Sequence, residues 1–247
     1  MTPLQELKQN LTSQKQALLL LGIAACCLVV LEYQGNAFLA PWSSLLKYFG
    51  WYEAFNHWLY YHEEAGLHQK LWWVAWTGIC YLVIPLLSCA VLGLSPLSLG
   101  LRWPGLKALV PYLLLYVLVL PLVFWAAHQP GFQATYPFFT SPLGLNSSDG
   151  IRQQISWELA YAFQFFALEF FFRGFITLGL KPSFGMASIF VMVLPYVMIH
   201  FSKPQPEAFG SLFAGLILGY MSWKSNSIWG GVLLHVAVAW TMDGLAV

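Results

Sequence analysis

Long apolar runs separated by short polar segments dominate the chain. A helix needs about 20 mostly apolar residues to cross a bilayer, because unsatisfied backbone groups are costly in hydrocarbon. Seven runs meet or approach this length. They cover residues 15–33, 71–94, 106–127, 155–180, 184–201, 209–223 and 228–245. The pattern predicts an all-α, polytopic transmembrane bundle with seven or eight spans.

Between the first two runs, the segment 34–69 has a different pattern. Tryptophan, tyrosine and phenylalanine residues alternate there with Lys47, Glu53, Glu63 and Glu64. Aromatic residues mixed with charges are typical of helices that lie along the membrane surface. We therefore expect one or two interfacial helices after the first span.

Composition agrees with a membrane protein. Hydrophobic residues make up 59% of the 247 residues and charged residues 9%, whereas soluble domains have about 45–50% and about 25%. The net charge of +1 provides no basic surface for nucleic acid. We expect a single integral membrane domain over residues 1–247, with N-terminal spans in 1–150 and a core in 151–247, and the lipid bilayer as its partner.

The positive charges of the connecting segments give an orientation. If the N-terminus is cytoplasmic, six basic residues fall on that side and four on the other. The six are Lys8, Lys15, Arg102, Lys107, Lys181 and Lys224, and the four are Lys47, Lys70, Arg152 and Lys203. The excess predicts a cytoplasmic N-terminus.

Ionisable residues inside spans are costly and usually have a partner in the protein interior. Apart from Lys15, Glu32 and Lys107 at the edges of spans, those within the predicted spans are Glu158, Glu169, Arg173, His200, His235 and Asp243. Glu169 and Arg173 are four residues apart, so they share one face of a helix and are expected to pair. Such a pair could simply lock two helices together.

Two histidines on other helices point to chemistry instead. A carboxylate and an imidazole in a dry cavity can draw a proton from water, and a second imidazole can stabilise an oxyanion. This set of groups suits hydrolysis of an amide or ester. A proton-coupled transporter would use similar groups, but the interrupted helices in two related halves that such transporters usually have are not found in this sequence.

The same residues resemble a known family. The run from Glu169 through Arg173 to Phe175, then Tyr196 to His200, then His235 look like the three ordered motifs of the CAAX-protease and bacteriocin-processing family of intramembrane glutamic endopeptidases. Supporting segments at 99–102, 215–220 and 227–235 look similar as well. The resemblance implies His200 beside a catalytic water, Arg173 paired with Glu169, and His235 facing the oxyanion. From the residues themselves we expect Glu169 to act as base at this water, with Tyr196 and Asp243 in support.

Two positions depart from the family pattern. Leu168 stands where a first, water-activating glutamate is usual, and Ala239 stands where asparagine or aspartate is usual. Two functions therefore stay open. One is an endopeptidase that cleaves a membrane-associated protein or peptide without a cofactor, in a bacterial inner membrane. The other is a catalytically impaired relative that binds or escorts a membrane protein.

Two further expectations concern geometry. His62 and His68 are six residues apart, about 240° round a helix, so the sequence predicts no metal site there. In the predicted topology His200 lies near a membrane surface and Glu169 lies deep. We therefore expect the fourth helix to be broken or the fifth to re-enter, with Pro195 permitting a kink.

Overall fold

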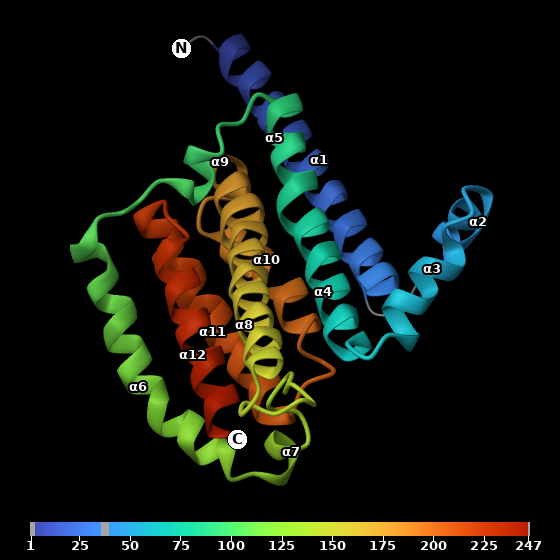
Figure 1. The fold of residues 1–247 in the computed structure, drawn as a ribbon. Coiled ribbons are helices and arrows are strands. Elements are labelled where there is room, and N and C mark those ends of the chain that lie inside the picture. Colours follow the sequence, from blue (N-terminus) through green and yellow to red (C-terminus); the bar gives the residue numbers. More distant parts are fainter. Residues whose placement is uncertain (1–2, 36–39, 247) are drawn as a thin grey trace.

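The computed structural model describes residues 3–35 and 40–246, which form helices and connecting loops with no strand (Figure 1). The all-α prediction is confirmed. The N-terminal part contains α1 (Pro3–Gly35), α2 (Ala40–Tyr48), α3 (Tyr52–Asn56), η1 (His57–Tyr61), α4 (Ala65–Gly78), η2 (Ile79–Val83), α5 (Ile84–Leu92), η3 (Leu97–Leu101), η4 (Leu106–Leu109) and α6 (Val110–Ala127). The C-terminal part contains α7 (Pro130–Gln133), α8 (Ser148–Glu169), η5 (Phe170–Leu178), α9 (Gly179–Phe184), α10 (Ala187–Met198), α11 (Gln205–Ser225) and α12 (Trp229–Leu245).

Four of the described helices are long and apolar enough to cross a membrane, and the chain is an integral membrane protein. These helices are Gln14–Gln34, Ala65–Leu92, Leu106–Ala127 and Ser148–Phe184. They contain most of the first four predicted spans. The shorter helices α10, α11 and α12 follow at the predicted fifth to seventh positions, so the total of seven or eight spans stays a prediction.

The helices form a central group with two flanks (Figure 1). The continuous helix α8–η5–α9 runs through the centre beside α10, α11 and α12. On one side α1 packs with α4, and on the other α6 packs against α12. The largest apolar cluster surrounds η5, where Phe170, Phe171, Phe172 and Phe175 have no exposed area. Burial of these four rings fixes η5, and with it the end of α8, at the centre of the protein.

The segment between α1 and α4 forms short helices, as expected for an interfacial segment. Figure 1 shows α2 and α3 extending away from the main bundle beside α1. Tyr48, Trp51 and Tyr61 are exposed there. Exposed aromatic rings next to charges suit a lipid headgroup region.

A tight turn joins α9 to α10. Gly185 adopts φ +53°, a conformation that costs a glycine little because it has no Cβ. Glu169 lies about 15 residues before this turn and His200 about 15 residues after it, so two antiparallel helices bring them to a similar depth. Residues Ser148–Phe184 form one helix. The expected break in the fourth helix is therefore absent, and re-entry of the fifth is not needed.

Hydrogen bonds from the η3 loop hold the start of α12. Gly100 in η3 has φ +93°, and its carbonyl accepts a hydrogen bond from Ile228 N–H at 3.0 Å. Trp229 Nε1 donates to the Leu101 carbonyl at 3.1 Å. The same loop packs on η5, where a Cβ at Gly174 would overlap the Leu99 carbonyl. The segment 99–102 thus fixes α12 relative to η5, and these two elements supply His235 and Arg173 to the site.

Candidate active site

The centre of the site is a buried ion pair at the junction of α8 and η5. Glu169 is the last residue of α8, and Arg173 lies one turn further along, inside η5. Arg173 Nη1 is 3.2 Å from Glu169 Oε1, and neither side chain has any exposed area. A buried charge is strongly destabilising without a partner, and the i, i+4 spacing places the guanidinium of Arg173 beside the carboxylate of Glu169. The predicted pair is present.

His235 reaches the same carboxylate from α12. Its Nδ1 is 2.6 Å from Glu169 Oε1. The approach depends on Gly231, one turn earlier on α12, because a Cβ at that position would overlap the Glu169 carboxylate. The carboxylate therefore has a guanidinium on one side and an imidazole on the other.

Replacing Gly231 with alanine should lower the free energy of unfolding by about 1–3 kcal/mol, the usual cost of overpacking. The added methyl group would push the carboxylate away from His235. Gly244→Ala is the matched control on the same helix, where a Cβ meets nothing. It should be neutral or stabilising by up to about 1 kcal/mol. Thermal unfolding in detergent micelles distinguishes the two, and equal shifts would contradict the tight contact.

Tyr196 links the ion pair to the histidines. Its hydroxyl lies 3.1 Å from His235 Nε2. Its ring lies under the Arg173 guanidinium, with Cζ 4.0 Å from the ring centroid. If the Tyr196 hydroxyl donates to Nε2, the proton of a neutral His235 lies on Nδ1 and is donated to the Glu169 carboxylate. These contacts form a continuous Glu169–His235–Tyr196 chain. Sequence reasoning had given Tyr196 only a supporting place.

His200 lies beside this chain without a direct contact to its acid. Its Nδ1 is 2.7 Å from the Tyr196 carbonyl, and its ring centroid is 4.8 Å from that of Tyr196. Among the described residues, no hydrogen bond or ion pair joins His200 to Glu169. The structure therefore brings Glu169, Arg173, His235 and Tyr196 into contact and attaches His200 through Tyr196.

Phe165 was missed. Its ring stacks on His235, with centroids 5.4 Å apart and an interplanar angle of 10°. Phe165 precedes Glu169 by four residues, so the helical repeat places both on one face of α8. The four-residue spacing could have identified Phe165, but the sequence contains many aromatic residues and offers no reason to choose this one.

Asp243 belongs to a different group of residues. Its Oδ1 accepts the Phe138 N–H at 3.1 Å, from the loop that follows α7. It is buried at 4% exposure, and its bond ties the end of α12 to this loop rather than to His235. Among the described residues, no hydrogen bond or ion pair joins Asp243 to His235, so the structure gives no support for its predicted role beside that histidine.

The two departures from the family motifs are apolar and buried. Leu168 and Ala239 are each 5% exposed and belong to two different hydrophobic clusters. Neither places a polar group at the site. Among the described residues, the one group of His, Cys, Asp and Glu side chains close enough to hold a metal ion lies elsewhere, at His62, Glu64 and His68.

The family comparison fits this arrangement. Residues 152–241 match the family model described as type II CAAX prenyl endopeptidase Rce1-like. Neither a search of curated proteins nor one of solved structures finds a match. The matched residues hold Glu169, Arg173, Tyr196, His200 and His235. Through this region the chain is similar to the CAAX-protease and bacteriocin-processing family.

Proposed function

We propose that this protein is an intramembrane endopeptidase that hydrolyses a peptide bond in a membrane-associated protein, with His200 activating the water and Glu169 acting through His235. The observation that carries the proposal is the position of His200, whose Nδ1 contacts the Tyr196 carbonyl beside the Glu169–His235–Tyr196 chain.

The base is His200. A backbone carbonyl only accepts hydrogen bonds, so the 2.7 Å contact with the Tyr196 carbonyl assigns the ring proton to Nδ1. The Nε2 lone pair is then free to accept a proton from water. The side chain is partly exposed, so water can reach it. These are the geometric requirements of a general base.

Glu169 acts mainly through His235. The carboxylate is fully buried, and its Oε1 contacts both Arg173 and His235. It accepts the Nδ1 proton of His235 and orients that ring, as a buried carboxylate does for histidine in a hydrolytic triad. A protonated His235 Nε2 can donate to the oxyanion formed when water attacks the peptide carbonyl, in place of the Tyr196 hydroxyl that it contacts in the structure. Tyr196 supports this ring through its hydroxyl.

The membrane presents the substrate. The family model is described as a prenyl endopeptidase, and we extend this to substrates that the bilayer brings to the site. They are a lipid-modified protein, a leader peptide or the tail of a membrane protein. The cell location we propose is a bacterial inner membrane, with the N-terminus cytoplasmic.

A second function is favoured by specific residues. Leu168 and Ala239 remove two polar groups that the family motifs usually provide, and the Glu169 carboxylate is sealed from solvent. A protein with this arrangement could bind or escort a membrane protein without cleaving it. The two functions differ in whether peptide cleavage depends on Glu169.

The substitution Glu169→Gln distinguishes the endopeptidase from the binding or escort protein. The expected result is loss of cleavage of membrane proteins taken from the same cells, because a neutral amide holds the Nδ1 proton of His235 less strongly than the carboxylate does. Glu158→Gln is the matched control, since Glu158 also lies on α8 and contacts Gln154 rather than the site. Helicity and elution volume of both variants report folding. If folded Glu169→Gln cleaves at the wild-type rate, or complements a deletion fully, the hydrolytic role of this site is excluded.

A further inference from the structure

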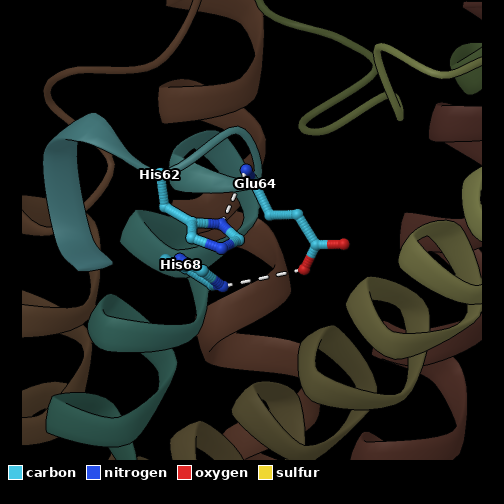
Figure 2. Close-up of side chains that lie close together, drawn as sticks. All are labelled: His62, Glu64 and His68. Carbon is cyan, nitrogen blue, oxygen red and sulfur yellow. Dashed lines mark hydrogen bonds and ion pairs between the residues drawn. The ribbon is translucent and has the colours of Figure 1, made fainter. Parts of the chain in front are cut away.

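A turn at the start of the apolar helix Ala65–Leu92 brings two histidines and a glutamate together. His62, Glu64 and His68 each offer one ligand atom, and these atoms lie within 4.8 Å of one another (Figure 2). His62 has an extended backbone at the end of η1, with φ −70° and ψ 150°. It therefore does not share a helix with His68, and the 240° separation assumed from the sequence is wrong. The two rings lie 5.0 Å apart.

His68 is oriented as a metal ligand usually is. Its Nδ1 is 2.7 Å from the Trp58 carbonyl, which places the proton on Nδ1 and leaves the Nε2 lone pair free. The Trp58 ring stacks on the imidazole at 4.4 Å and fixes its plane. A ligating histidine almost always donates its other N–H to a carbonyl or carboxylate in this way.

Glu64 provides a charged oxygen. Its Oε1 accepts hydrogen bonds from Arg152 and, at 3.2 Å, from Gln153. Its Oε2 faces His68 Nε2 at 3.8 Å (Figure 2). Hydrogen bonds from Gln153 and Arg152 lower the pKa of this carboxyl group, so it is ionised at neutral pH. One oxygen is held by α8 and the other faces the histidines.

His62 completes the set. Its Nδ1 accepts the Glu64 N–H at 3.1 Å. A metal ion bound at Nδ1 would replace this hydrogen bond, and one bound at Nε2 would require the proton to move to Nδ1. In both cases the Glu64 amide is released. The ligand atoms must also move closer, because neighbouring donors around tetrahedral zinc are about 3.3 Å apart.

We propose that His62, Glu64 and His68 bind a divalent transition-metal ion of the zinc type at this turn. Two imidazoles and one carboxylate are a donor set that zinc uses, with a fourth position left for water. The ion would join η1 to the first turn of α4 and, through Glu64, to the start of α8. Arg152 and Glu169 are separated by about 25 Å along α8, so this site is distinct from the buried ion pair.

Metal content of the full-length protein tests this directly. The protein would be purified in detergent with a tag that contains no histidine, stripped with a chelator and equilibrated with Zn²⁺ alone. We expect about one equivalent of bound Zn²⁺ per chain. His62→Ala and His68→Ala should each weaken binding at least tenfold, since even loss of an outer hydrogen-bonding partner costs about 10–100-fold. Co²⁺ should give the absorption spectrum of a tetrahedral or five-coordinate site in the wild type only.

His128→Ala is the matched control, because His128 is an exposed histidine of another loop. It should bind Zn²⁺ as the wild type does. His62 is partly exposed, so its removal should leave the fold intact even if loss of the buried His68 does not. Absence of bound Zn²⁺ in the wild type, or unchanged binding by folded His62→Ala, would overturn the proposal. Neither result depends on peptide cleavage at Glu169.

Discussion

Replacing Arg173 with methionine should lower the free energy of unfolding by about 3–5 kcal/mol, because it leaves the Glu169 carboxylate buried without its guanidinium. Methionine keeps much of the volume, so the loss reports the charge more than a cavity. Both side chains have no exposed area, and water cannot replace the missing partner. Thermal or denaturant unfolding in detergent would measure the change.

The double variant Glu169→Gln, Arg173→Met gives the sharper result. It removes both charges and keeps an acceptor for His235, so it should recover most of the stability lost in Arg173→Met. Arg152→Met is the control for removing an arginine from an ion pair, since Arg152 is exposed and pairs with Glu64. It should have little effect. A small loss in Arg173→Met, or a double variant no more stable than the single, would show that this pair is hydrated.

Replacing His200 with alanine should reduce peptide cleavage by about 10²–10⁴-fold, the usual contribution of a general base. The protein should remain folded, because the His200 side chain is partly exposed and its one hydrogen bond is to a carbonyl of its own helix. The measurement is the cleavage rate of membrane proteins at saturating substrate.

His128→Ala is a close match for this test. His128 also follows a helix, and its Nδ1 is 2.7 Å from the carbonyl four residues earlier, at Phe124. The two variants therefore lose the same local hydrogen bond, and only one is near Glu169. Full cleavage activity in His200→Ala would remove His200 from the mechanism, and equal losses in both variants would point to a general structural effect.

Local spacing predicted part of the site. The Glu169–Arg173 pair follows from four residues on one helix in an apolar segment, where each charge needs a partner nearby. The similar depth of Glu169 and His200 was also present in the sequence, as equal distances from Gly185. The sequence reasoning placed them at different depths because it treated each apolar run as a full span, whereas α10 ends at Met198.

Contacts between distant segments were not predictable in the same way. The partner of Glu169 at 2.6 Å is His235, which is 66 residues later, and the contact depends on Gly231 and on the η3 loop that holds α12. Motif order placed His235 at an oxyanion and Glu169 with His200. Asp243 was expected near His235 and instead binds the Phe138 amide.

The sequence by itself determined that this chain is a helical membrane protein and that Glu169, Arg173 and Asp243 lie in its interior. Hydropathy is sufficient for this prediction. The free energy of placing an apolar run or a charge in the bilayer depends mainly on that segment itself and can be judged from the sequence. Only the tertiary structure decided which of these groups touch. The same holds for His62 and His68, whose approach depends on one extended residue before α4. Contact distances depend on how helices pack and turns close, and these reflect many side chains at once rather than any single motif.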